Sequence, residues 1–274
     1  MDERVRAWGV DIEKILDTES SVLAFGRRNR QPVVLKMIKR PGDEWFAGPV
    51  LEAFNGRGVV RVLDYADGAM LLERLLPGRS LFGTEGIDDE AATEILAEVI
   101  GGMSAASAPD TATVEAWSDG FRRYAERGTA EISAALVEAA CRLYAELCHS
   151  QSSTRLLHGD LHHYNVLLDS QRGWVAIDPK GVVGELAYEV GAALRNPVER
   201  PATFAAPATI ERRVGCFAEV LGLTAERVLA WAFAQAILAA IWEVEDTGVL
   251  NTGVGFVALA NAIRPMLGAP GIDA

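Results

Sequence analysis

The chain has 274 residues, half of them hydrophobic, so it can bury the core of one large domain or of two lobes. Its formal net charge of −12 argues against a nucleic-acid-binding protein, because such a protein needs a basic face. The acidity is compatible with a cationic substrate, but as support it is weak, because many cytosolic proteins are equally acidic.

Residues 1–75 predict a β-rich unit with one helix. The candidate strands are residues 12–16, 22–25, 32–39, 59–65 and 70–72, with a turn at 28–30. Lys36 lies inside the strongest of these strands, with apolar residues on both sides. Either this strand is at the edge of the sheet and Lys36 faces solvent, or Lys36 is buried and needs an anionic partner. The phosphate oxygens of a nucleotide would be such a partner.

A short helix is expected from Glu44 to about Phe54, irregular because Gly48 and Pro49 lie in its middle. Glu44 is the preferred partner for Lys36, and Glu52, close to the helix end, is the rival. Either carboxylate could instead be a solvated surface charge.

The sequence has no glycine-rich GxGxxG phosphate loop. Ser20 and Ser21, in the turn before the second strand, are the candidate replacement, because hydroxyl and backbone N–H groups can bind phosphate. After the last strand the chain leaves the sheet through Glu73 and Leu75. Their backbone groups would contact adenine if this is where a kinase connects its lobes; the alternative is an ordinary strand exit.

From about residue 85 onward, apolar residues recur at intervals of three and four, which predicts helices. The predicted helices are residues 88–106, 113–127, 129–149, 185–194, 208–221, 225–245 and 254–266. The segment that carries the chemistry lies between the third and the fourth of them.

Residues 158–165 read HGDLHHYN, and a second carboxylate, Asp178, follows in the sequence IDP. Phosphoryl transfer from ATP needs one carboxylate to orient the attacking hydroxyl, and oxygen ligands for a magnesium ion on the phosphates. Asp160 suits the first task, and Asn165 and Asp178 suit the second. A buried structural His–Asp pair would explain a lone HGD, but not the whole pattern.

Two apolar runs around the turn at 169–173 place the second carboxylate. Residues 166–168 and 174–177 read as the two strands of a short hairpin. Such a hairpin would return Asp178 to the side of Asn165.

The remaining composition indicates a cytoplasmic protein outside the membrane. Three cysteines, an odd and sparse number, give no disulfide framework. Residues 1–4 are charged and lack the apolar core of a signal peptide. The longest apolar run, residues 228–242, is interrupted by Gln235 and is shorter than a membrane span. We therefore expect no membrane and no nucleic acid among the partners, and a monomer or weak dimer.

The order of strand lysine, helix glutamate, HGDLHxxN and IDP resembles the aminoglycoside phosphotransferases. Residues 55–63, 158–165 and 172–185 look more closely like the aminoglycoside/hydroxyurea resistance kinases, with streptomycin 6-phosphotransferases as the nearest group. This resemblance implies an α+β, bilobal, protein-kinase-like fold. A small β-rich nucleotide-binding lobe would cover residues 1–75, and a larger helical lobe with the catalytic loop and the substrate site would cover residues 76–274.

The resemblance also implies roles for single residues, with ATP and magnesium as cofactors. Lys36 would contact the ATP phosphates and Glu44 would pair with it. Asp160 would be the catalytic base and His158 would brace its loop. Asn165 and Asp178 would bind magnesium. Tyr164 and Lys180 lie beside these positions and are candidates for contacts with the substrate or the loop.

The implied reaction is phosphorylation of a hydroxyl of an aminoglycoside, streptomycin at its 6-hydroxyl, giving antibiotic resistance. Streptomycin carries guanidinium groups, so acidic residues should line its site. The candidates are Glu185, Glu189, Glu243, Glu245 and Asp246, although each could equally be a solvated charge. Two alternatives stay open. One is a kinase for another aminoglycoside, hydroxyurea, a sugar or an amino alcohol, and the other is a nucleotide-binding pseudokinase.

Overall fold

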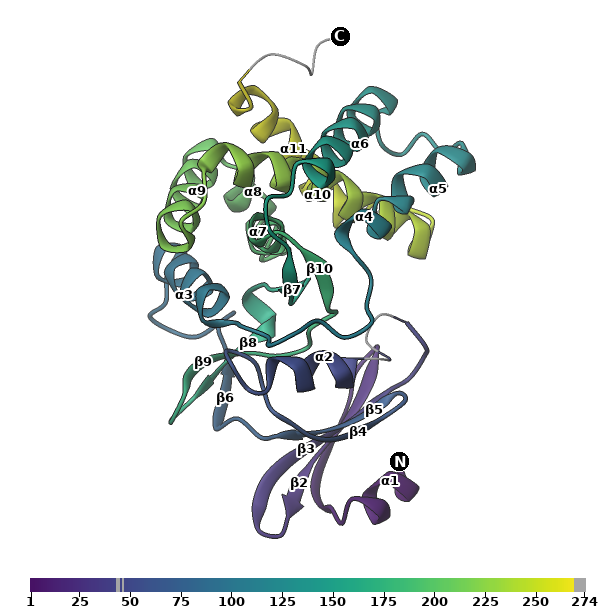
Figure 1. Ribbon diagram of the computed structural model, residues 1–274, viewed down its shortest axis with the longest axis vertical. Helices are drawn as coiled ribbons and strands as arrows, with labels where there is room; N and C mark the ends of the chain where they lie inside the picture. The colour runs from purple at the N-terminus through teal and green to yellow at the C-terminus, as the bar shows by residue number, and fades with distance from the viewer. Residues whose placement is uncertain (43–44, 46, 269–274) are drawn as a thin grey trace.

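An antiparallel five-stranded sheet forms the N-terminal part of the molecule (Figure 1). The structure is a computed structural model and describes residues 1–42, 45 and 47–268. In space the strands follow the order β1-β2-β3-β5-β4, so β3 lies at the centre. The strands are β1 (Asp11–Asp17), β2 (Ser21–Arg28), β3 (Gln31–Ile38), β4 (Val62–Ala66) and β5 (Ala69–Glu73).

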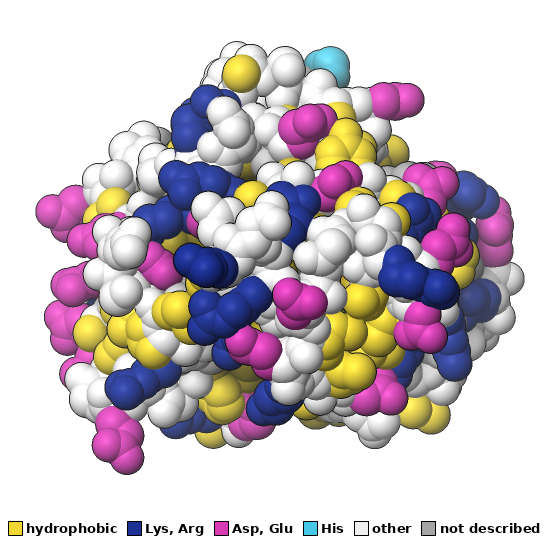
Figure 2. Space-filling view, turned by 90° about the horizontal axis from the view of Figure 1, so that it is seen from below, with side chains coloured by type: hydrophobic (Ala, Val, Ile, Leu, Met, Phe, Trp, Pro, Cys, Tyr) yellow, Lys and Arg dark blue, Asp and Glu magenta, His cyan; other side chains and the backbone are white. Residues whose placement is uncertain are grey.

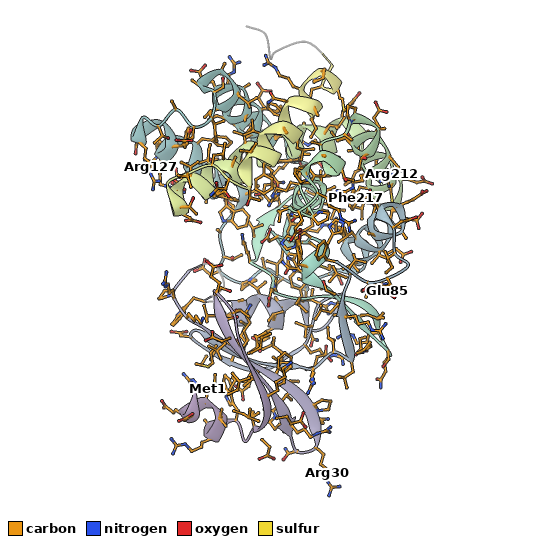
Figure 3. All side chains as sticks on the ribbon, turned by 180° about the vertical axis from the view of Figure 1, so that it is seen from behind. Met1, Arg30, Glu85, Arg127, Arg212 and Phe217 are labelled. Carbon is orange, nitrogen blue, oxygen red and sulfur yellow. The ribbon has the colours of Figure 1, made fainter. Side chains whose placement is uncertain are left out.

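The β2–β3 hairpin turns through Asn29 and Arg30, which confirms the predicted turn. Both residues have positive φ, 51° and 69°, as a two-residue turn that matches the twist of the strands requires. Figure 3 shows Arg30 at the outer tip of this hairpin, far from the helical part. Figure 2 views the same end of the molecule, where basic, acidic and hydrophobic side chains are mixed across the face.

Two helices accompany the sheet. α1 (Asp2–Ala7) precedes β1, and α2 (Ala47–Phe54) lies between the sheet and the rest of the molecule (Figure 1). α2 contains Pro49 in its first turn, where the missing N–H removes no helical hydrogen bond. The predicted start of this helix at Glu44 lies outside the described residues.

Two small sheets follow the large one. β6 (Pro77–Ser80), β8 (Val166–Asp169) and β9 (Gly173–Ala176) form one, in the order β6-β8-β9. β7 (Arg155–Leu157) and β10 (Val182–Gly184) form the other. The β8–β9 pair is the predicted hairpin. The chain thus changes sheets between Glu73 and Pro77, while the lobe boundary at residue 75 stays a prediction.

The C-terminal part is helical, which confirms the predicted α+β class. The predicted helix at 113–127 is interrupted at Ser118, and the one at 129–149 begins only at Ala134, after Gly128 ends the preceding helix in a left-handed conformation. Its α-helices are α3 (Asp89–Gly102), α4 (Val114–Trp117), α5 (Asp119–Arg127), α6 (Ala134–His149), α7 (Leu186–Leu194), α8 (Pro201–Phe204), α9 (Pro207–Leu221), α10 (Ala225–Thr247) and α11 (Gly253–Ile263).

α10 is the central helix of this part and packs against α5, α6, α7, α9 and α11. The helix extends beyond the apolar run 228–242 at both ends, and its 23 residues make it long and apolar enough to cross a membrane by length and composition. However, 67% of its apolar window is buried inside the protein. Trp231 and Ile237 are fully buried, and the buried amide of Gln235 donates to the backbone oxygen of Tyr188. These contacts describe the core helix of a globular part.

Candidate active site

The catalytic loop after β7 is fixed by a buried, neutral histidine. Nε2 of His158 donates to the backbone oxygen of Ile177 at 2.8 Å, and its Nδ1 accepts from the backbone N–H of Asp160 at 3.3 Å. Burial lowers the pKa of His158 to about 4, so the ring carries no charge at neutral pH. His158 therefore holds the loop that carries Asp160 against the segment that leads to Asp178.

A buried carboxylate holds the same loop from the other side. Glu189, on α7, accepts hydrogen bonds from the backbone N–H groups of His158 at 2.6 Å and Gly159 at 3.1 Å. Gly159 has φ +82°, and a Cβ atom there would approach the Trp117 ring to 3.0 Å. Only glycine fits this corner without strain. Burial raises the pKa of Glu189 to about 7.

The carboxylate of Asp160 lies among nitrogen atoms. Lys180 Nζ is 3.3 Å from Oδ2, Arg195 Nη2 is 3.5 Å from Oδ1, and His162 Nε2 is 3.8 Å from Oδ2. Burial favours the neutral acid, but these neighbours, Lys180 foremost, outweigh it and hold the pKa of Asp160 well below its usual range. Asp160 is therefore ionised, as a residue that orients a hydroxyl and accepts its proton needs to be.

Two oxygen donors lie next to this carboxylate, in the arrangement that the hairpin predicts. The backbone N–H of Ile177 donates to the backbone oxygen of Asn165 at 2.9 Å, which places Asp178 one residue beyond that bond. Nδ2 of Asn165 donates to the backbone oxygen of Asp160 at 2.9 Å, so the amide oxygen is the atom that a cation would use. Asp178 has φ +59°, which is uncommon for a residue other than glycine and occurs in turns and at functional sites.

These donors fit magnesium. Amide and carboxylate oxygens are the hard ligands that Mg²⁺ takes from proteins, usually one or two of them, with water and phosphate oxygens completing the shell. Among the described residues no group of three or more His, Cys, Asp or Glu side chains is placed to hold a metal. Asn165 and Asp178 stay the residues that we predict to hold the ion.

Lys36 forms a salt bridge with Asp178. Its Nζ lies 2.8 Å from Oδ1 of Asp178, and the lysine side chain is only 4% exposed. Because β3 is the central strand, the alternative of an edge-strand lysine facing solvent is excluded. The predicted partner Glu44 lies outside the described residues, so that pairing stays a prediction.

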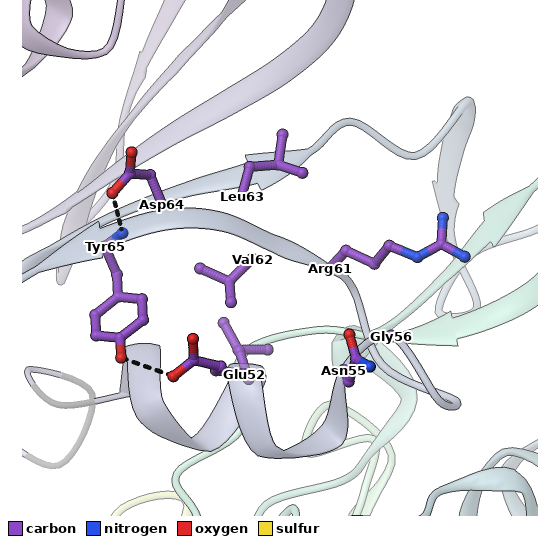
Figure 4. Close-up of a pocket in the computed structure, with 9 residues that line it drawn as sticks. Glu52, Asn55, Gly56, Arg61, Val62, Leu63, Asp64 and Tyr65 are labelled. Carbon is purple, nitrogen blue, oxygen red and sulfur yellow. Dashed lines mark hydrogen bonds between the residues drawn. The ribbon is translucent and has the colours of Figure 1, made fainter.

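The rival partner, Glu52, points elsewhere. It accepts a hydrogen bond from the Tyr65 hydroxyl at 2.9 Å, across a cavity of about 520 Å³ between α2 and β4 (Figure 4). Asn55, Arg61 and Asp64 also line this cavity. Its described lining includes neither Asp160 nor Lys36, so this cavity is separate from the catalytic residues.

The candidate phosphate loop is only partly open. Ser21 is buried at 3% exposure, and its hydroxyl bonds that of Thr18 at 3.1 Å. Ser20 lines a cavity of about 530 Å³ with Lys39, Arg40 and Lys180. Of the two serines, Ser20 is therefore the one in a position to meet a phosphate group.

The residues predicted to meet adenine have other contacts. The carboxylate of Glu73 accepts from the backbone N–H of Arg61 at 2.8 Å and binds the guanidinium of Arg172, and the backbone N–H of Glu73 donates to the oxygen of Arg61. Leu75 is buried at 7% exposure. The predicted contact concerns backbone groups of Glu73 and Leu75 and stays a prediction.

Four of the five acidic residues expected to line the substrate site bind other groups of the protein, and three of these four support junctions between helices and loops. Glu189 supports the catalytic loop, as described above. Glu185 accepts from Arg227 Nε at 2.6 Å and from the indole N–H of Trp231. Glu243 accepts from three backbone N–H groups, at residues 251–253, where α11 begins. Their carboxylates stabilise helix and loop junctions, so we no longer expect Glu185, Glu189 and Glu243 to bind substrate.

The other two acidic residues line a cavity of about 380 Å³ with Trp117, Trp242 and Lys180. Glu245 forms a bidentate salt bridge with Arg123 there, in which Nε and Nη2 of the arginine each donate to one carboxylate oxygen at 2.9 Å. Asp246 is the second carboxylate of this lining. Since Lys180 also contacts Asp160, the cavity adjoins the catalytic loop.

Sequence reasoning missed Arg195 and the two tryptophans of this site. Arg195 directly follows the apolar helix α7, and this position could have indicated a buried guanidinium, which requires an anionic partner. Trp117 and Trp242 carried no such sign, since they lie on separate helices, α4 and α10, far apart in the sequence. The folded chain brings their rings together, with the ring centres 5.6 Å apart and the ring planes almost perpendicular.

Comparison with known proteins gives the family. A family model described as aminoglycoside/hydroxyurea antibiotic resistance kinase matches residues 8–247. The chain is 32% identical over 244 residues to streptomycin 3″-kinase from Klebsiella pneumoniae, covering 85% of this chain and 88% of the relative. It is 30% identical over 267 residues to streptomycin 6-kinase from Streptomyces glaucescens, covering 89% and 81%. It is also 32% identical over 241 residues to hydroxyurea phosphotransferase from Kitasatospora aureofaciens, covering 82% and 66%.

Solved structures agree on the fold. The aminoglycoside phosphotransferase APH(4)-Ia, in a ternary complex with ADP and hygromycin B, superposes with a TM-score of 0.64 at 15% identity, covering 98% of this chain and 99% of that one. Choline kinase LicA from Streptococcus pneumoniae gives 0.65 at 13% identity, covering 96% and 97%. Both likenesses confirm the predicted bilobal, protein-kinase-like fold. The chain therefore belongs to the aminoglycoside/hydroxyurea antibiotic resistance kinase family, and it is a phosphotransferase that uses an alcohol group as acceptor.

Proposed function

We propose that this protein transfers the γ-phosphoryl group of ATP to the 6-hydroxyl of streptomycin, with magnesium as the metal. The observation that carries the proposal is one continuous set of contacts. Asn165 binds the backbone of Asp160 at 2.9 Å, and Lys36 binds Asp178 at 2.8 Å, next to the hydrogen bond between Ile177 and Asn165. A base, two hard oxygen donors and a phosphate-binding lysine are thus within reach of one transferred group.

The chemistry follows from this arrangement. Asp160 is ionised and orients the acceptor hydroxyl, and its carboxylate receives the proton as the new P–O bond forms. Lys36 neutralises charge on the phosphate oxygens of ATP. Asn165 and Asp178 would hold magnesium, which when bound supplies further positive charge to those oxygens. Most of the rate gain then comes from positioning and from fixed charges.

The cavity beside Lys180 suits the acceptor. Trp117 and Trp242 contribute aromatic rings to its lining, although Lys180 Nζ already lies 5.9 Å from the centre of the Trp242 ring. Asp246 offers a carboxylate, which pairs with a guanidinium group. Streptomycin carries guanidinium groups, and two of the relatives named above act on streptomycin. We assign Asp246 as the acidic residue that contacts the substrate.

A second candidate is the same reaction at another acceptor. Support for it is equally direct, because the streptomycin 3″-kinase and the hydroxyurea phosphotransferase are each 32% identical to this chain, against 30% for the 6-kinase. The 3″-hydroxyl of streptomycin and the hydroxyl of hydroxyurea are therefore the alternatives to test.

The test is an acceptor screen with the purified full chain, ATP and magnesium, in which ADP release is measured. Streptomycin is compared with hydroxyurea, hygromycin B and choline, and NMR locates the phosphate on the product. We expect streptomycin to give the highest rate and the phosphate to lie on the 6-hydroxyl. ADP release with streptomycin no faster than with water alone would overturn the proposal. A phosphate on the 3″-hydroxyl would overturn only the position.

A further inference from the structure

Lys180 lies where two cavities meet. It lines the cavity of about 530 Å³ bounded by the β1–β2 turn and the end of β3, together with Lys39 and Arg40. It also lines the cavity of about 380 Å³ that contains Trp242 and Asp246. The first cavity is basic and contains Ser20 of the candidate phosphate turn, and the second is the proposed acceptor site. If the first cavity holds the phosphates of ATP, the transferred group passes Lys180 on its way to the acceptor.

The backbone of Lys180 is fixed while its head group is accessible. The N–H groups of Lys180 and Gly181 both donate to the backbone oxygen of His158, at 2.9 and 3.0 Å. The lysine side chain is 28% exposed. The residue is thus anchored to the catalytic loop, and its long side chain can turn toward a bound group.

Asp160 keeps a cationic partner if Lys180 turns away. Lys180 contacts Oδ2 of Asp160, whereas Arg195 contacts Oδ1. The Arg195 side chain is only 8% exposed and also donates to Gln235 Oε1 at 3.3 Å, which fixes it in place. Lys180 is therefore the more mobile of the two cations, and its charge can be shared with an incoming anion.

The catalytic loop itself offers no fixed positive charge at the transfer point. Residues 158–165, all of which the structure describes, contain three histidines and neither lysine nor arginine. Asp160 is the one carboxylate of this loop, and the loop supplies no lysine or arginine charge to a passing phosphoryl group. A phosphoryl group in transfer carries negative charge on its equatorial oxygens, which a nearby cation stabilises.

We propose that Lys180 is a catalytic residue that contacts the transferred phosphoryl group. In the step, the bond between the γ-phosphorus and the bridging oxygen of ADP breaks, and a bond between that phosphorus and the acceptor oxygen forms. The hydroxyl proton goes to Asp160. Lys180 stays protonated throughout and binds an equatorial oxygen of the moving group. This inference rests on the proposed phosphoryl transfer, but not on the identity of the acceptor.

The first test compares Lys180→Met and Lys180→Arg with Lys14→Met, a control on the exposed strand β1. Turnover at saturating ATP and streptomycin, the dissociation constant of ATP and the thermal unfolding temperature are measured for each. Loss of one charge that acts on the transition state should lower kcat by roughly 10²–10³. We expect Lys180→Met to lose this much with ATP affinity and unfolding temperature preserved, Lys180→Arg to recover part of it, and Lys14→Met to match the wild type. A Lys180→Met protein whose kcat equals that of the wild type overturns the inference.

A second test separates a contact with the phosphoryl group from an effect on Asp160. Lys180→Met is combined with Asp160→Asn, and the residual rates are compared. If Lys180 acts on the moving phosphoryl group, its removal lowers the residual rate of Asp160→Asn as well. If that rate does not fall, Lys180 only positions Asp160, and the inference is wrong.

The two proposals fail in different ways. If no acceptor stimulates ADP release, the proposed function fails, and the same Lys180 variants are then compared in the slow transfer of phosphate from ATP to water. There too, an unchanged rate in Lys180→Met contradicts the inference. If streptomycin is phosphorylated but Lys180→Met is fully active, only the inference about Lys180 fails.

Discussion

Two carboxylates that meet the same loop have opposite pKa shifts. Glu189 is enclosed by backbone N–H groups and apolar side chains, and burial raises its pKa to about 7. Asp160 is partly buried, which also favours the neutral acid, but Lys180, His162 and Arg195 outweigh this effect and lower its pKa. The sign of each shift therefore depends on whether charged partners converge on the group. The structure thus distinguishes Asp160, the proposed base, from Glu189, which supports the loop.

Asp160→Asn should lower turnover by about 10²–10⁴-fold, the usual contribution of a general base. The amide keeps the shape of the side chain but cannot accept the proton. ATP affinity should be unchanged, because Lys36 and Asp178 are untouched. Asp119→Asn, on an exposed helix, serves as the control, since its surface pair with Arg122 contributes little. Equal turnover of Asp160→Asn and the wild type in the ADP-release assay would contradict the assignment.

Glu189 should make the protein less stable as the pH rises. Above the reference value of 4.5 the unfolded chain loses this proton, while the folded chain keeps it up to about pH 7. The free energy of unfolding should therefore fall between these two values by up to about 1.4 kcal/mol per pH unit.

Glu189→Gln removes the group that titrates. Asp160, whose charge also raises the pKa of Glu189, is unchanged in this variant. Urea unfolding is measured from about pH 4.5 to above pH 7. The free energy of unfolding of the variant, relative to that of the wild type, should rise up to about pH 7 and then stay constant. A difference that does not change with pH would contradict the predicted shift.

Sequence reasoning found the residues whose chemistry is local. Asp160, Asn165 and Asp178 lie within one loop and one hairpin, and their spacing was sufficient to bring them together. It could not separate Glu189 or Glu185 from substrate-binding carboxylates. Glu189 finds its partner 31 residues upstream and Glu185 finds Arg227 42 residues downstream, so only the tertiary fold shows that they are occupied.

The same division holds for secondary-structure elements. The β8–β9 hairpin was predictable because both strands and the turn are adjacent in sequence. β7 and β10 have three residues each. They pair with residues 158–181 between them, the segment that contains Asp160, Asn165 and Asp178. Elements this short carry no periodic pattern, and they exist because tertiary contacts hold them.

Gly181 shows how tightly these elements are joined. It has φ +77°, and a Cβ atom there would lie 2.4 Å from Cγ2 of Val50 on α2. Gly181→Ala should therefore cost roughly 1–3 kcal/mol of unfolding free energy and should also lower turnover, because the loop that carries Lys180 must shift.

Gly215→Ala is the matched control for this change. Gly215 lies inside α9, where a Cβ atom would meet nothing within 4 Å, so the substitution should stabilise the protein by about 0.4–1 kcal/mol. Urea unfolding measures both variants. Equal effects of the two substitutions would show that the contact with α2 is not tight.

At the scale of the whole molecule, one arginine connects the five-stranded sheet to the small sheet of β6, β8 and β9. Arg172, in the β8–β9 turn, binds Glu73 of β5 with one nitrogen, and its Nη2 donates to the backbone oxygen of Val59 at 3.0 Å. Close by, Ala176 of β9 exchanges backbone hydrogen bonds with residues 58 and 60, at 2.9 and 2.8 Å. Sequence reasoning treated Glu73 only as a strand exit near adenine, because its partner lies 99 residues away.

A double-mutant cycle of Arg172→Met and Glu73→Gln should measure this connection. The pair is about one-fifth exposed, so its coupling should exceed that of a surface ion pair and lie in the range of about 0.5–3 kcal/mol. Each single variant should lower the free energy of unfolding, and the double variant should lose less than the sum of the two. Because Glu73 lies where we predict that adenine binds, Arg172→Met should also raise the KM for ATP. Arg122→Met, whose partners Asp119 and Glu126 are both on an exposed helix face, should change neither quantity. Additive losses in urea unfolding would show that Arg172 and Glu73 stabilise their own elements and do not join the two sheets.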